Sequence, residues 1–243
     1  MRKIAALLAL TLLTATACQA QYKTDEFKTQ SGKTVKITFI KHASIQISYR
    51  GLEFYADPVY EFQPRTDFTR FPKANFILVT HEHRDHYDKE ALAQLKTPAT
   101  TLYLNQSVYN DYRHGQVVAN GDSLSIDTDI QLQVVPAYNT TPGREQMHPK
   151  GRDNGYILTL DGLRIYIAGD TEDIPEMANL DPIDIAFLPC NQPYTMTPQQ
   201  LERAARIIKP RVLYPYHYSE TPIRQIPLLL AGSGIDVRIR DMK

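Results

Sequence analysis

Three histidines and an aspartate lie within six positions of the stretch VTHEHRDHYD (79–88), in a chain of 243 residues that contains seven histidines. They are His81, His83, Asp85 and His86. Neutral imidazoles and carboxylates are typical zinc ligands. Because His81 and His83 are two residues apart, an extended backbone points both side chains the same way. The pattern predicts that this pair faces one metal ion and that the Asp85–His86 pair faces a second ion a few ångströms away.

Further residues of ligand type recur where strands are expected to end. These are His148 in MHPKG, Asp170 in AGDT and His217 in YPYHY. A site at the edge of a sheet needs its ligands at strand termini or in the adjoining loops. A carboxylate such as that of Asp170 can bridge two cations, with one oxygen on each. Two zinc ions would lower the pKa of a shared water and generate hydroxide near neutral pH.

The elements that must position these residues are mainly strands. Asp88 is expected to cap a short helix, and Thr197, Pro198 and Gln200 predict a helix that ends at Ile208. The pairs Arg50-Gly51 and Asp161-Gly162 indicate hairpin turns. Strands are predicted at 34–40, 44–49, 52–56, 76–80, 100–104, 123–126, 130–135, 155–168 (a hairpin), 183–189 and 211–217. Strands flanked by helices on two sides predict a layered α/β protein.

The order of these motifs resembles that of a known superfamily. THEHRDH resembles the HxHxDH signature of the metallo-β-lactamase fold, and a third histidine, GDT and a final strand ending in His follow in order. ITFIKHASIQISYRGLEFYADP resembles the opening hairpin of the branch with the ascorbate-6-phosphate lactonase-like and N-acylphosphatidylethanolamine phospholipase D-like proteins. The similarity spans residues 34–220. It implies a single α/β domain over residues 22–243, folded as a four-layer αββα sandwich.

The resemblance also implies a ligand set for two zinc ions, with Mn²⁺ or Fe²⁺ as alternative metals. His83 favours hydrolytic zinc, because the redox di-iron relatives place Glu at that position. The first ion would be bound by His81, His83 and His148, the second by Asp85, His86 and His217, and Asp170 would bridge them.

One departure from the family pattern leaves the third histidine open. In the phospholipase D-like relatives this histidine follows a Pro-Ala-x element, which here ends in Asn139. We predict that His148, nine residues later, completes the first site, with Asn139 as the alternative. His42 and Asp57, in the HAS and ADP motifs, are expected to line the metal site or to orient a ligand through outer hydrogen bonds, or else to form a buried pair that holds the opening hairpin.

These residues predict a metal-dependent hydrolase for a small-molecule substrate. A metal-bound hydroxide would attack an ester, lactone or phosphodiester, and Asp85 would act as the catalytic proton shuttle. The alternative is a non-catalytic periplasmic protein that binds a metal or ligand on the same fold. The sequence does not indicate the oligomeric state.

The overall charge excludes one class of partner, since 27 basic residues balance 27 acidic residues for a formal net charge of zero. Nothing in this balance favours binding to nucleic acid. Residues 1–17 combine two basic residues, a short apolar run and small residues, which is typical of a signal peptide. Cleavage there would leave Cys18 as a lipidated N-terminus.

The protein is therefore expected to be exported, as a membrane-anchored lipoprotein or, if cleavage follows Ala20, as a soluble periplasmic protein of a bacterium. Cys190 would then lack a disulfide partner.

Overall fold

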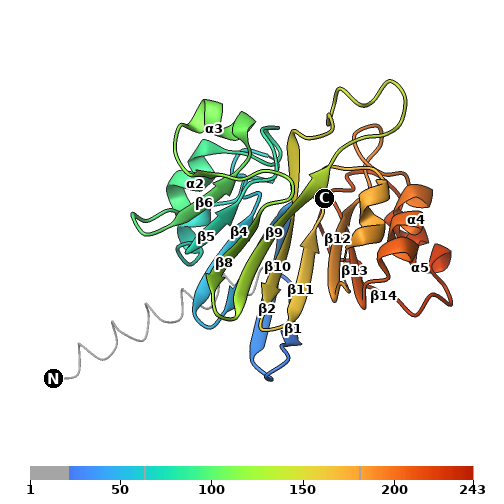
Figure 1. Cartoon of the computed structure of the whole chain (residues 1–243), viewed down its shortest axis with the longest axis horizontal. Helices are drawn as coiled ribbons and strands as arrows, with labels where there is room; N and C mark the ends of the chain where they lie inside the picture. The colour runs from blue at the N-terminus through green and yellow to red at the C-terminus, as the bar shows by residue number, and fades with distance from the viewer. Residues whose placement is uncertain (1–21, 63, 181, 243) are drawn as a thin grey trace.

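The computed structural model describes residues 22–62, 64–180 and 182–242. Two seven-stranded sheets pack face to face, and helices cover their outer faces (Figure 1). The predicted signal peptide and Cys18 lie outside the described residues, so export and lipidation stay predictions. In the described part of the chain, no helix combines the length and apolar character needed to cross a bilayer.

The strands of the first sheet follow one another in chain order. They are β1 (Thr24–Lys28), β2 (Thr34–Lys41), β3 (Ser44–Tyr49), β4 (Leu52–Ala56), β5 (Phe76–Leu78), β6 (Thr101–Leu104) and β7 (Gln116–Val117). Strands β1 to β4 pair antiparallel, whereas β4 to β7 pair parallel. The carboxyl ends of β4, β5 and β6 therefore meet at one edge of the sheet.

The second sheet repeats this topology. Its strands are β8 (Ser123–Asp127), β9 (Ile130–Ala137), β10 (Asp153–Leu160), β11 (Leu163–Ile167), β12 (Ile185–Pro189), β13 (Val212–Tyr216) and β14 (Asp236–Val237). Strands β8 to β11 pair antiparallel and β11 to β14 pair parallel. The two halves of the chain thus share one pairing pattern, although no repeat is visible in the sequence.

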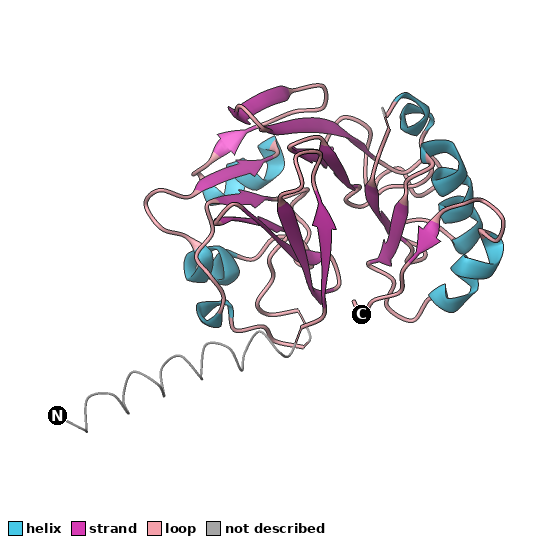
Figure 2. Ribbon diagram, turned by 90° about the horizontal axis from the view of Figure 1, so that it is seen from below, coloured by secondary structure: helices cyan, strands magenta, loops and turns pink. Residues whose placement is uncertain are grey.

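Helices form the two outer layers (Figure 2). On the first sheet lie α2 (Lys89–Leu95) and α3 (Gln106–Tyr112), and on the second lie α4 (Pro198–Ile208) and α5 (Ile226–Leu229). Short 3-10 turns occur at Phe68–Arg70, Pro175–Asn179 and Ile223–Gln225. The predicted four-layer αββα sandwich is confirmed.

Apolar side chains hold the layers together. The main core lies between the sheets and continues beneath α4, and includes Ile37, Ile45, Leu158 and Phe187. All residues of β12 are buried, as an uninterrupted apolar run predicts for a strand covered on both faces. A second cluster, including Ile77 and the buried residues of α2, fills the space between the first sheet and its helices.

Local signals in the sequence match the turns and caps. Asp161 and Gly162 have positive φ angles, as a two-residue hairpin turn requires. The Thr197 side chain accepts from the Gln200 backbone N–H and the Gln200 side chain accepts from that of Thr197, which completes the predicted capping box. Strands β1, β7 and β14 and helices α3 and α5 were not predicted, because most are too short for a clear hydrophobic period.

Asp88 caps α2 and also binds the loop after β4, so its contribution to stability can be tested. One carboxylate oxygen accepts from the backbone N–H groups of Glu90 and Ala91, and the other from those of Tyr60 and Glu61. Asp88→Ala should lower the free energy of unfolding by about 2 kcal/mol, because a cap and two loop hydrogen bonds are lost. Urea unfolding would measure this change.

Asp111→Ala is the matched control, since that exposed carboxylate accepts only from side chains. Equal effects of the two substitutions would contradict the role assigned to Asp88.

Candidate metal centre

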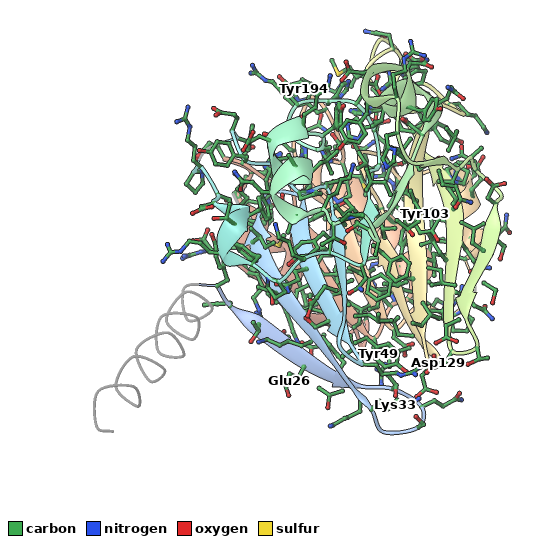
Figure 3. The ribbon with its side chains drawn as sticks, turned by 90° about the vertical axis from the view of Figure 1, so that its left-hand side faces the viewer. Glu26, Lys33, Tyr49, Tyr103, Asp129 and Tyr194 are labelled. Carbon is green, nitrogen blue, oxygen red and sulfur yellow. The ribbon has the colours of Figure 1, made fainter. Side chains whose placement is uncertain are left out.

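The predicted ligand residues converge at one edge of the sandwich, where parallel strands of both sheets end. His81 follows β5, Asp170 follows β11 and His217 follows β13, while His42 lies in the β2–β3 turn. In Figure 3, Tyr194 marks this end of the molecule, and Tyr49 and Asp129 lie at the opposite end.

A first group of potential ligands contains His81, His83, His148 and Asp170. Their ligand atoms lie within 4.8 Å of one another. His81 Nε2 is 3.1 Å from His83 Nδ1, and His148 Nε2 is 3.4 Å from Asp170 Oδ2. The structure thus brings His148 together with His81 and His83.

A second group contains Asp85, His86, His217 and also His42. Asp85 Oδ2 lies 3.3 Å from both His217 Nε2 and His42 Nε2. From the sequence, His42 was expected to line the metal site, to orient a ligand from outside it or to pair with Asp57. In the structure its imidazole belongs to the second group itself and packs against the His217 ring, with a centroid distance of 3.9 Å.

Asp170 lies between the two groups. Its Oδ1 is 3.2 Å from His86 Nε2, and its Oδ2 is 3.3 Å from His217 Nε2 and 3.9 Å from His81 Nε2. The side chain is only 3% exposed. A buried carboxylate with histidines of both groups around it has the position that a bridging ligand requires.

The spacings of these atoms fit a metal centre. Tetrahedral zinc with ligands at about 2.0–2.1 Å separates neighbouring ligand atoms by roughly 3.3 Å. Most of the nitrogen–oxygen distances above lie close to that value. Hydrogen-bond geometry does not account for them, because Nε2 of His86, His148 and His217 and Oδ1 of Asp170 are buried without a hydrogen-bond partner in the described chain. Buried polar atoms normally have partners, so these atoms fit the coordination of cations by the two groups.

The electrostatics favour the protonation states that metal binding needs. Burial lowers the pKa of His81, and the neighbouring His86 lowers it further. Burial and the nearby His217 lower the pKa of His42 to about 4. Although burial opposes it, His217 and His86 hold the pKa of Asp170 well below its usual value. Neutral imidazoles and an ionised carboxylate are the forms that bind metal.

His86 differs from the other histidines. Burial opposes its charged form, but the carboxylates of Asp170, Asp57 and Asp85 raise its pKa well above the usual value. Without a metal, this histidine holds a proton among three carboxylates. A cation would replace that proton, so binding is expected to release it.

Two further carboxylates, those of Asp57 and Asp153, contact the Nδ1 atoms of ligand histidines. His86 Nδ1 lies 2.8 Å from Asp57 Oδ2, and Asp57 also accepts from the backbone N–H and the hydroxyl of Thr80. His148 Nδ1 lies 3.0 Å from Asp153 Oδ2. Such carboxylate–histidine pairs fix the ring orientation and leave Nε2 for the metal. The sequence suggested Asp57, but Asp153 was missed because the strand was expected to begin at residue 155.

The loop that carries His148 is fixed by polar contacts. Asn139 is buried beside this loop. Its side-chain amide donates to the carbonyl of Tyr194 at 2.8 Å, and its backbone N–H donates to the carbonyl of His148 at 2.9 Å. Buried Glu172 accepts from the backbone N–H groups of Thr140 and Thr141. Asn139 therefore anchors the loop that carries His148.

The backbone is strained where three of these residues leave their strands. His42, Asp57 and His217 have φ angles of 45°, 43° and 47°. Left-handed backbone costs a residue with a Cβ about 1–2 kcal/mol. Hydrogen bonding stabilises this arrangement, since the His217 backbone N–H donates to the His42 carbonyl at 3.1 Å. Strain of this kind concentrates at functional sites.

A cleft of about 520 Å³ opens onto both ligand groups. His83, Asp85, His148 and Asp170 lie along its floor, together with His42. Its remaining lining comes from the loops after β4, β9, β12 and β13 and from one residue of the metal motif: Phe62, Gln146, Met147, Asn191, Tyr194, Ser219 and Arg84. A volume of this size is in the range of small-molecule sites.

Comparisons with known proteins agree with this geometry. Residues 36–217 match the family model of the β-lactamase superfamily domain. The chain therefore belongs to the metallo-β-lactamase-fold superfamily of metal-dependent hydrolases, as the sequence motifs predicted.

Individual relatives extend the match over most of the chain. A UPF0173 metal-dependent hydrolase from Ligilactobacillus salivarius is 34% identical over 197 residues, which cover 77% of this chain and 87% of that protein. Its counterpart from Thermococcus kodakarensis is 31% identical over 202 residues, covering 79% and 89%.

Solved structures agree as well. The crystal structure of a protein from Parabacteroides distasonis, described as a metal-dependent hydrolase, superposes with a TM-score of 0.89 at 52% identity, covering 91% of this chain and all of that one. A metallo hydrolase from Ignicoccus hospitalis shares the fold with a TM-score of 0.71 at 23% identity, covering 85% and 95%.

The role of His148 can be tested through metal affinity. His148→Ala should weaken zinc binding by more than the roughly 10–100-fold that loss of an outer partner costs, because the first group loses an imidazole. His114→Ala, which removes an exposed histidine outside both groups, should leave the affinity unchanged. Competition with a chromophoric chelator would measure both. Normal zinc affinity in His148→Ala would show that another residue completes the site.

Asp153 gives a separate test of the outer carboxylates. Asp153→Asn should weaken zinc binding about 10- to 100-fold, since the amide cannot stabilise the His148 ring as a carboxylate does. The control is Asp127→Asn, an exposed position that pairs with Arg50. The same chelator competition applies, with circular dichroism to verify the fold. An affinity equal to that of the parent protein would exclude a role for Asp153 in metal binding.

Proposed function

We propose that this metal-dependent hydrolase uses two zinc ions to cleave an ester, lactone or phosphodiester bond in a small molecule. One observation carries the proposal: a single cleft reaches both groups of ligand atoms, with the carboxylate of Asp170 between them. A binding protein would not need two adjoining groups open to one cleft. Zinc is favoured because histidine provides most of the ligand atoms in both groups.

The residues fit distinct tasks. His81, His83 and His148 would hold the first ion, Asp85, His86 and His217 the second, and Asp170 both. His42 is close enough to Asp85 to adjoin the second ion. When bound, the ions would polarise the scissile group and lower the pKa of a water molecule.

Asp85 is the carboxylate best placed to handle a proton. Its side chain is 25% exposed, whereas that of Asp170 is 3% exposed, and Asp85 lines the cleft beside His42. His42 Nε2 is hydrogen-bonded to one of its oxygens at 3.3 Å, and His217 Nε2 lies 3.3 Å from the same oxygen, so the carboxylate is fixed in direction. We assign to Asp85 the orientation of the attacking water and the transfer of its proton toward the leaving group.

The location of the activity remains a proposal from the sequence. The apolar N-terminal segment and Cys18 support export, either to the periplasm or to a membrane through a lipid anchor. This location is independent of the chemistry proposed for the cleft.

A panel of aryl esters, lactones and phosphodiesters tests the function. Zinc-loaded protein should hydrolyse at least one class, lose the activity with a chelator and regain it with zinc. Asp85→Asn should lower kcat at least about 100-fold, the scale typical of a positioned acid–base group. Asp111→Asn is the surface control. Tight zinc binding without turnover of any class would instead favour the binding-protein alternative.

A further inference from the structure

We propose that Arg84 forms an anion subsite that selects small esters carrying a carboxylate group. This inference deepens the proposed function and rests on it. Arg84 stands between His83 and Asp85 in the chain, and the cleft is lined by all three. A guanidinium at this position would bind a charged group of the substrate while the scissile bond lies over the two ligand groups.

The electrostatic environment of Arg84 distinguishes it from the other cations near the cleft. Arg84 is exposed, and no carboxylate among the described residues lies within ion-pair distance of it. By contrast, Arg152 pairs with Asp153 and Glu82, and Arg144 donates to Gln192. Apart from histidines, Arg84 is therefore the basic residue of the described cleft lining, and its charge is available to a bound substrate.

Two aromatic side chains and a methionine also line the cleft. Phe62 packs on His42 with ring centroids 4.5 Å apart. Its loop is clamped by the buried Lys41, whose ammonium donates to the carbonyls of Tyr60, Phe62 and Pro64. Tyr194 is 49% exposed at the rim, and Met147 lines the cleft beside His148. These surfaces suit a flat apolar group.

The charge of the subsite favours a carboxylate. One guanidinium can bind one carboxylate through two parallel hydrogen bonds. A phosphate dianion would leave its second charge unpaired, because no other lysine or arginine of the described residues lines the cleft. A small ester with an aromatic or apolar body and one carboxylate fits the guanidinium of Arg84, the apolar lining of the cleft and the adjoining ligand groups.

Two matched esters test the proposal, 4-acetoxybenzoate and its neutral methyl ester, because both release the same acetyl group. Arg84→Gln should lower kcat/KM for the anion about 10-fold or more and change that for the methyl ester less than about 2-fold, as expected for loss of one charge-assisted contact. Arg84→Lys should restore part of the difference. Arg70→Gln, an exposed arginine outside the cleft, should affect neither ester. Equal changes for both esters in Arg84→Gln would overturn the proposal.

A binding measurement separates this inference from the proposed function. With zinc content matched, calorimetry should show that 4-hydroxybenzoate binds the parent protein about 10-fold more tightly than Arg84→Gln. Methyl 4-hydroxybenzoate should bind both alike. If neither ester is hydrolysed but this difference in affinity persists, the proposed ester hydrolysis is refuted and the proposed anion subsite is supported. Equal affinities of the two proteins for the anion would refute the subsite, whatever the activity.

Discussion

The buried carboxylate of Asp170 is the constraint on which the site depends. It is almost wholly removed from solvent and has histidines of two ligand groups within 3.2–3.9 Å. An isolated charge would be costly at this depth, so its surroundings must provide compensating charge. In the described residues this compensation can come only from protonated histidines such as His86 or from cations bound between the groups. The close packing of ligand atoms around Asp170 therefore matches what a bound cation would require.

The fold brings the histidines and Asp170 together because the parallel strands of both sheets end at one edge of the sandwich. Strands β5, β11 and β13 deliver His81, Asp170 and His217 from the two sheets, and these strands are buried. Fixed strand ends reduce the entropy lost when ligands are ordered around an ion. The left-handed turns at His42 and His217 direct their side chains across the gap, and packing of the two sheets stabilises these strained conformations.

The fold and most of the cluster could be predicted from sequence, because the strand ends carry strong local signals. The HxHxDH spacing and the Asp-Gly and Thr-Pro-x-Gln motifs each depend on nearby residues, and the structure agrees with their interpretation. His42 and Asp153 could not be assigned in this way. Their contacts join segments 43 and five residues apart, through a turn and a long loop whose conformations no periodic pattern encodes.

The site has two parts: residues at strand ends whose positions suit metal binding, and loop residues that would contact the substrate. Ligand atoms on strand ends have little freedom, since small displacements would break the spacing of about 3.3 Å that a zinc ion needs. The wall formed by Phe62, Met147 and Tyr194 comes from loops, which tolerate change. Arg84 links the two parts, because its backbone is fixed between two ligand-group residues while its side chain faces the cleft. Its side chain thus starts from a fixed backbone position beside the ligand groups, so a carboxylate bound by the guanidinium would favour ester bonds within its reach.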